Sequence, residues 1–151
     1  METQRKFTSK IDYNKSVDDG VSKIENLAYE IEKKVGKLQF VLSALKATQP
    51  TSNQSYNSFI SEALKNAKTL ESASKDLQFS GKYFDEDGVV FSFLNRAVST
   101  LDNAVNSNSF KTAEDLITKS SKSRDANIIS SLKKLVNQIK STARKIESMP
   151  W

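Results

Sequence analysis

The sequence contains neither cysteine nor histidine. Their absence excludes disulfide frameworks, thiol nucleophiles, zinc sites built from these two residues, and any imidazole acid or base. Only four glycines and two prolines interrupt the 151 residues. Turn signals are therefore scarce, and long helices are favoured over a many-stranded sheet. No stretch approaches about 18 apolar residues, and the polar first ten residues lack the apolar core of a signal peptide, so we expect a soluble cytoplasmic protein.

The length fits one domain of ordinary size. Hydrophobic residues make up 37% of the chain and charged residues 27%, which is polar for a globular protein. The apolar residues nevertheless recur at regular spacings, which is not typical of a disordered chain. We expect 1–151 to form a single all-α helical domain, with 1–15 flexible and a basic segment at 106–151.

The clearest periodic pattern lies between residues 16 and 48. Nine apolar residues recur there at alternating spacings of four and three, which places them on one seam of a helix. They are Val17, Val21, Ile24, Ala28, Ile31, Val35, Leu38, Leu42 and Leu45. Ser16 followed by Asp19 resembles a capping box at the start of this helix, and Pro50 marks its end. This seam fits either the core of a bundle or an interface with another chain.

The larger side chains of the same helix allow two interpretations. Leu27, Phe40 and Val41 are placed to widen the apolar stripe, as in a helix that packs against more than one neighbour. Tyr29 and Phe40 also lie off the seam, however, and are candidates for outward-facing anchors.

Three further helices follow from the same kind of pattern. One spans about 52–77, presents a face of small alanines and forms an antiparallel hairpin with the first helix because the link is short. A loop at 106–109 precedes a short helix at about 110–118. The last helix covers about 125–148, with Pro150 beyond its end. Together with the first helix and a helix that contains Leu94 and Leu101, these three predict a bundle of four main helices and one short helix.

Residues 79–94 are ambiguous. In one interpretation Asp87 caps a helix whose apolar stripe continues through Val90, Leu94 and Leu101. In the other, a small β-hairpin near 80–93 surrounds an acidic turn, and the helix begins near Leu94. The heptad spacing favours the helix, whereas the Phe, Tyr and Val content favours the strands.

The net charge of +5 is concentrated in the last third of the chain. Residues 106–151 contain nine Lys or Arg and four Asp or Glu, so this segment alone carries a charge of +5. On a helical wheel of the last helix, one flank of the apolar stripe carries Lys133, Asn137, Lys140 and Arg144, with no acidic residue of that helix between them. Eleven residues rise about 16 Å, so this flank predicts an outward-facing row of cations and one amide.

The loop before that helix adds Lys119, Lys122 and Arg124 among serine and threonine hydroxyls. Several cations at regular spacing, together with short polar donors, are suited to phosphate oxygens. Because aromatic residues are sparse in this third of the chain, we expect contact with the backbone of DNA or RNA rather than stacking on bases. An ordinary solvated helix face is the alternative, and binding to a membrane surface is less favoured because the final helix has no aromatic residue on its apolar face.

The acidic run Asp85, Glu86 and Asp87 does not have the ligand spacing of a calcium loop, and an acidic turn or helix start explains it equally well. No Gly-rich phosphate loop or nucleophile elbow is present either. We therefore expect no catalytic residues, no metal site and no cofactor. A structural bundle that binds a protein partner or self-associates is the alternative to nucleic-acid binding.

The chain is small, basic and mostly helical, and it has neither Cys nor His. It combines a long opening helix (SVDDGVSKIENLAYEIEKKV) with the alternative of an aromatic hairpin at 80–93. In this overall build, which spans most of the chain, the protein resembles the small subunit of the archaeal type I-A CRISPR effector complex. The resemblance implies a non-catalytic subunit of an antiviral ribonucleoprotein, placed beside the backbone that carries the guide RNA. It also implies contact with other protein subunits and with displaced or target DNA.

Overall fold

The computed structural model describes residues 10–48, 54–78, 89–120 and 127–148. These residues form five α-helices and no strand. The helices are α1 (Lys10–Thr48), α2 (Gln54–Leu77), α3 (Val89–Val105), α4 (Asn108–Ser120) and α6 (Ile128–Glu147). The predicted all-helical class, with four main helices and one short helix, is confirmed for this part of the chain.

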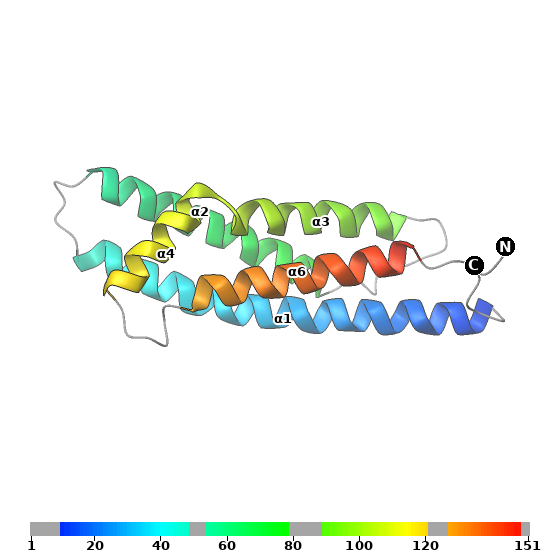
Figure 1. Ribbon diagram of the computed structural model, residues 1–151. Helices are drawn as coiled ribbons and strands as arrows, with labels where there is room; N and C mark the ends of the chain where they lie inside the picture. Colours follow the sequence, from blue (N-terminus) through cyan, green and yellow to red (C-terminus); the bar gives the residue numbers. More distant parts are fainter. Residues whose placement is uncertain (1–9, 49–53, 79–88, 121–126, 149–151) are drawn as a thin grey trace.

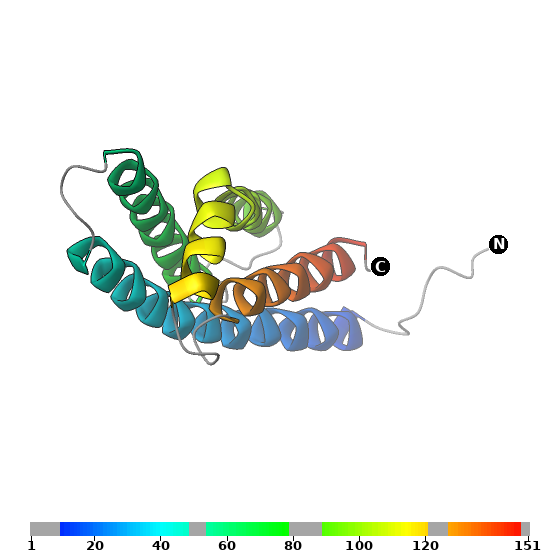
Figure 2. The ribbon, with the colours of Figure 1, turned by 60° about the vertical axis from the view of Figure 1, so that its left-hand side comes forward.

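The four longer helices form a bundle in which neighbours run in opposite directions (Figure 1). In this bundle α1 packs on α2, α2 on α3, α3 on α6, and α6 back on α1, which closes the ring. The short helix α4 follows α3 in the chain and lies inclined to the other helices, where it packs on α2 (Figure 2). The helices α1, α3 and α6 therefore each have two packed flanks and one outward side, whereas α2 also carries α4.

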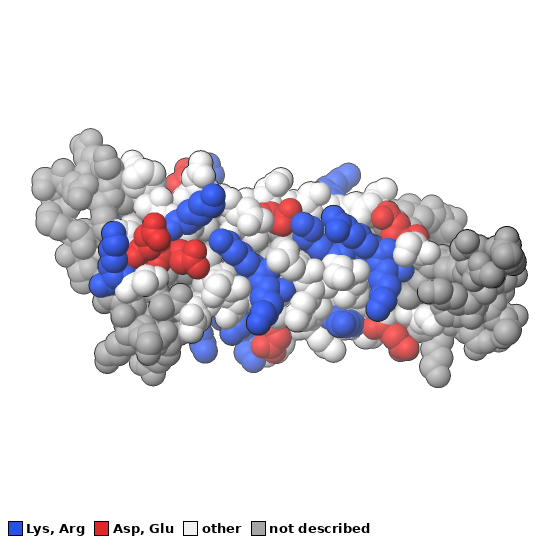
Figure 3. Space-filling model, in the orientation of Figure 1, with Lys and Arg blue, Asp and Glu red and all other residues white. Residues whose placement is uncertain are grey.

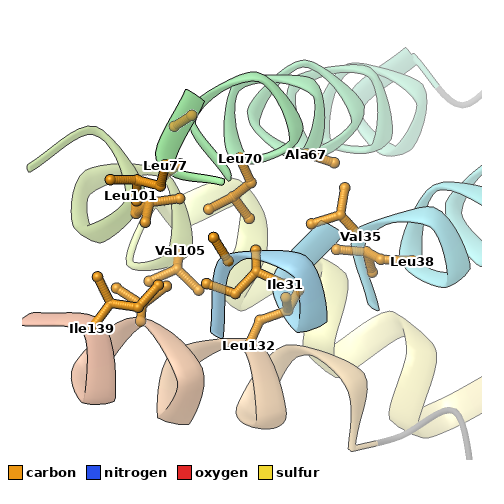
Figure 4. Close-up of a cluster of buried hydrophobic side chains, with 14 of the residues drawn as sticks. Ile31, Val35, Leu38, Ala67, Leu70, Leu77, Leu101, Val105, Leu132 and Ile139 are labelled. Atoms are coloured by element: carbon orange, nitrogen blue, oxygen red, sulfur yellow. The ribbon is translucent and has the colours of Figure 1, made fainter. Parts of the chain in front are cut away.

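The core follows the apolar spacing of the sequence. All nine seam residues of α1 are buried, and so are the small residues Ala63 and Ala67 on α2. Figure 4 shows Ile31 of α1, Leu70 of α2 and Leu132 of α6 pointing toward one another in the middle of the bundle. Burial of these side chains supplies the main driving force for folding, since it removes apolar surface from water.

Gly20 allows α1 and α6 to approach closely. A Cβ atom at this position would lie 2.7 Å from both Cγ1 and Cδ1 of Ile146, which is closer than such atoms pack. The side chain of Ile146 therefore fills the space that a larger residue at position 20 would occupy. This contact places the N-terminal half of α1 beside the C-terminal end of α6 and fixes the register of the antiparallel pair.

The turn between α3 and α4 is held by α2. The Asn66 side-chain amide donates hydrogen bonds to the hydroxyls of Ser107 (3.1 Å) and Ser109 (2.7 Å). The Ser107 hydroxyl also accepts from the backbone N–H of Phe110 at 3.4 Å, as a residue capping the start of a helix does. These contacts orient α4 so that the Phe110 side chain is fully buried.

Helix boundaries differ from the sequence-based prediction at several places. The short helix α4 runs from Asn108 to Ser120, so it begins inside the predicted loop at 106–109 and ends beyond residue 118. The first helix begins at Lys10 rather than at Ser16, so Ser16 lies inside α1 and does not cap it. The segment before Ser16 has no Gly or Pro to stop a helix, and the capping-box pattern alone was a poor guide to the boundary. The last helix begins at Ile128 rather than near 125.

The structure assigns residues 89–93 to the start of α3, as the helical interpretation of the ambiguous segment predicted. The remainder of the alternative hairpin, at 80–88, lies outside the described residues.

Tyr29 and Phe40, two aromatic residues of α1, face solvent. Leu27 and Val41 are partly buried against the core and widen the apolar stripe as expected. Phe40 does not, because 78% of its surface is exposed. It lies on the side of α1 opposite the seam, where no other described helix packs. Tyr29 is also exposed, at 52%.

Candidate nucleic-acid interface

The flank of α6 that the sequence singled out faces neighbouring helices. Lys140 Nζ lies 3.3 Å from Asp102 Oδ2 of α3, and Lys133 Nζ lies 3.9 Å from Glu114 Oε1 of α4. The exposed fractions of these two lysine side chains are only 26% and 31%. The predicted uninterrupted row of cations is therefore interrupted by acidic residues that come from other helices.

The α3 helix follows this flank of α6 further toward its C-terminal end. The Asn95 side-chain amide donates to Glu147 Oε2 at 2.9 Å. Between that hydrogen bond and the Lys140–Asp102 pair lies a hollow of about 260 Å³, lined in part by Asn95, Asp102, Lys140 and Arg144. Of the four residues predicted on this flank, Lys133 and Lys140 thus contribute to helix packing.

Three other basic residues of α6 are exposed to solvent, although Arg144 also lines the hollow beside α3. Lys134, Arg144 and Lys145 are exposed, and so are Asn137 and Ser141, which lie between them on the same side of the helix. Within the described part of the chain, no carboxylate lies within ion-pair distance of Lys134, Arg144 or Lys145. From Lys134 to Lys145 the helix rises about 16 Å, since each residue adds about 1.5 Å.

The neighbouring helix α1 adds two more lysines. Glu32 on α1 accepts a hydrogen bond of 2.7 Å from the side chain of Gln78, the residue that directly follows α2. This flank of α1 therefore faces α2. On a helical wheel Lys34 and Lys37 fall on the other flank, which faces α6. Lys37 is exposed and Lys34 is half-buried. Neither has a carboxylate within ion-pair distance among the residues for which side chains are described.

We call this surface the outer basic face. Its members are Lys34, Lys37, Lys134, Arg144 and Lys145. Figure 3 shows lysine and arginine side chains gathered over α6, with acidic side chains beside them. Of these five residues, only Arg144 belongs to the site predicted from the sequence. The helical wheel of α6 already places Lys134 and Lys145 beside Ser141. Lys34 and Lys37 lie in a segment without net charge, and only the packing of α1 on α6 brings them to this surface.

The remaining predicted site residues lie in three kinds of place. Asn137 is exposed on α6, between the cations of the outer basic face. Lys119 is exposed in the last turn of α4, not in the loop where the sequence placed it. Lys122 and Arg124 lie outside the described residues, as does the acidic run Asp85–Asp87.

A second basic surface lies between α2 and α3. The cavity there has a volume of about 490 Å³, and its lining includes three cations, one acidic residue and two small side chains: Lys65, Lys68, Arg96, Asp76, Ala73 and Ala97. The three cations are exposed, and no ion pair joins them to another residue in the described ranges. The sequence did not point to this groove, because residues 50–105 carry a net charge of −2. We refer to it as the α2–α3 groove.

None of the described helices combines the length and the apolar character that crossing a membrane requires. No family model, curated protein or solved structure matches the chain.

Proposed function

We propose that the protein is a non-enzymatic, nucleic-acid-binding subunit that contacts the phosphate backbone through the outer basic face. The observation that carries this proposal is the set of three exposed cations on α6, Lys134, Arg144 and Lys145, which no described carboxylate neutralises. A cation without an internal partner keeps its full attraction for an external anion. Lys133 and Lys140, by contrast, already pair with carboxylates of the protein itself.

The spacing of these cations suits a nucleic-acid strand. They extend over about 16 Å of α6, and a duplex presents one phosphate per strand about every 3.4 Å along its axis. Asn137 and Ser141 lie between the charges and supply side-chain donors for phosphate or sugar oxygens. The sequence of α6 contains no aromatic residue on which a base would stack. Backbone contact without sequence readout is therefore the mode that this surface supports.

The proposal predicts a definite dependence of affinity on salt. Release of counterions from duplex DNA makes the logarithm of the binding constant fall by about 0.9 per contacted phosphate for each tenfold rise in salt. Three to five cations of the outer basic face therefore predict a slope of about −3 to −4.5. Fluorescence anisotropy with a labelled DNA duplex, repeated over a range of NaCl concentrations, measures this slope. A slope near zero, or no binding at low salt, would contradict the proposal.

The type I-A effector resemblance stays a prediction that rests on overall build. The proposed phosphate contact does not depend on this resemblance, because the proposal rests on the exposed charges of the outer basic face alone. Within such an assembly, the same face would lie against guide RNA or target DNA, while other surfaces contact protein neighbours.

A further inference from the structure

The α2–α3 groove has an apolar floor. Ala73 of α2 and Ala97 of α3 are buried at its base. Thr69 and Thr100 also line it, and each hydroxyl donates to the backbone carbonyl four residues earlier on its own helix, at 3.2 Å and 3.0 Å. Neither threonine therefore donates a hydrogen bond into the groove, and the floor offers mainly carbon atoms to whatever binds there.

Three cations border this floor. Lys65 and Lys68 lie about one turn apart on α2, and Arg96 lies on α3, across the groove. All three are exposed, and none has an ion-pair partner among the helices that the structure describes. Asp76 is the one acidic residue in the lining, so the groove carries a net charge of +2. An apolar floor with a basic rim is complementary to a ligand that is apolar on one side and acidic at its edges.

The groove has the length and the direction that a helical ligand needs. Its α2 lining runs from Lys65 to Asp76, which corresponds to a rise of about 16 Å, or about three helical turns. The small floor residues allow close approach of a third helix, whose ridge of side chains fits between two packed helices. Along α2 the two lysines lie at one end and Asp76 at the other. The most acidic end of the ligand is therefore expected beside the lysines.

We propose that the α2–α3 groove binds an acidic amphipathic helix of another protein. The apolar side chains of that helix lie on the alanine floor, and its carboxylates lie beside Lys65, Lys68 and Arg96. Amphipathic helices commonly bind in this way, with the apolar face in a groove and specific side chains as anchors. Opposite charges around such a contact select the partner and speed association. The proposal does not rest on the proposed function, because nucleic acid takes no part in it.

A protein helix fits this surface better than a phosphate backbone does. Phosphate groups have no apolar surface to bury on Ala73 and Ala97. Asp76 repels a phosphate, whereas a helix can place a neutral or basic side chain beside it. The outer basic face differs in this respect, since polar Asn137 and Ser141 lie between its cations instead of buried alanines.

Isothermal titration calorimetry with two synthetic peptides tests the proposal without nucleic acid. Both peptides have about 18 residues and the same apolar face of leucine and alanine, and their flanks carry glutamate in one and lysine in the other. At about 0.1 M NaCl the acidic peptide is expected to bind with a Kd of about 10–100 μM, and the basic peptide at least about tenfold more weakly. Equal binding of the two peptides, or no binding of the acidic one, would overturn the proposal.

A variant without a charge change separates docking in the groove from simple attraction of charges. Ser72 is exposed and lines the groove, so Ser72→Trp fills part of it and leaves all cations in place. This variant should bind the acidic peptide at least about tenfold more weakly. Ser22→Trp, at an exposed serine of α1, is the matched control and should change the affinity by less than about threefold. Equal affinities of the two variants would contradict docking in the groove.

Charge reversal distinguishes this groove from the outer basic face. Reversal of its three cations (Lys65→Glu, Lys68→Glu and Arg96→Glu) should weaken binding of the acidic peptide at least about tenfold, because attraction becomes repulsion. Reversal of the three α6 cations (Lys134→Glu, Arg144→Glu and Lys145→Glu) changes the net charge equally and should cost less than about threefold. A larger loss in the second variant, or displacement of the peptide from the groove by a DNA duplex, would overturn the proposal.

Discussion

Reversing the three outward charges of α6 is expected to lower the affinity for duplex DNA on the order of 10³-fold at about 50 mM salt, because three phosphate contacts are lost. The variant carries Lys134→Glu, Arg144→Glu and Lys145→Glu. All three side chains are exposed, so the fold should stay intact. The salt slope should also become shallower by about 3. Fluorescence anisotropy measures both quantities, and circular dichroism checks the fold.

The α2–α3 groove supplies a matched control for this experiment. Lys65→Glu, Lys68→Glu and Arg96→Glu together change the net charge by the same amount and also alter only exposed residues. When both variants are also compared at 0.1 M salt, where charges farther apart than about 10 Å are largely screened, this control should lose less than about tenfold in affinity. Equal losses in the two variants would show that binding depends on net charge alone, and the outer basic face would then have no special role.

Replacement of Phe110 by alanine is expected to destabilise the fold by about 3–5 kcal/mol, as is usual when a fully buried aromatic side chain is removed. Phe110 has 0% exposure and is the largest of the fully buried side chains in the described core. It lies at the start of α4, where the hydrogen bonds of Asn66 hold the preceding turn in place and limit how far the cavity can collapse. Urea denaturation at 25 °C measures the change.

A loss of this size would remove a large part of a total stability of about 5–15 kcal/mol. Phe40→Ala is the control, since it makes the same chemical change at a position that is 78% exposed. This control should shift the free energy of unfolding by no more than about 0.5 kcal/mol. A Phe110→Ala variant within about 1 kcal/mol of wild type would contradict the packing described for α4.

The buried seam of α1 could be predicted because it is a property of one helix. Spacings of three and four place residues such as Ile31 and Leu38 on one face whatever packs against them. The start of α1 could not be predicted from Ser16, because a capping side chain has no effect where the backbone before it also continues the helix. Phe40 was ambiguous for a related reason, since its position on the wheel does not say how many neighbours the helix has.

The sequence of α6 alone could not predict which cations on its basic flank pair with carboxylates of other helices. Lys140 meets Asp102, which lies 38 residues away in the sequence, and Lys133 meets Glu114 of another helix. Which flank of α6 faces α3 and α4 depends on the order of helices around the bundle. The wheel therefore found the cations correctly but could not distinguish those that pair internally from those that remain available on the outer basic face.

Chemical-shift mapping tests the location of the phosphate contact most directly. A chain of 16.9 kDa is small enough for two-dimensional ¹H–¹⁵N spectra of the uniformly labelled protein, recorded as a DNA duplex is added at low salt. We expect the largest changes at the backbone amides of Lys134, Ser141, Arg144 and Lys145, with smaller changes at Lys37. Changes centred instead on Lys65, Lys68 and Arg96, or spread evenly over the surface, would contradict this expectation.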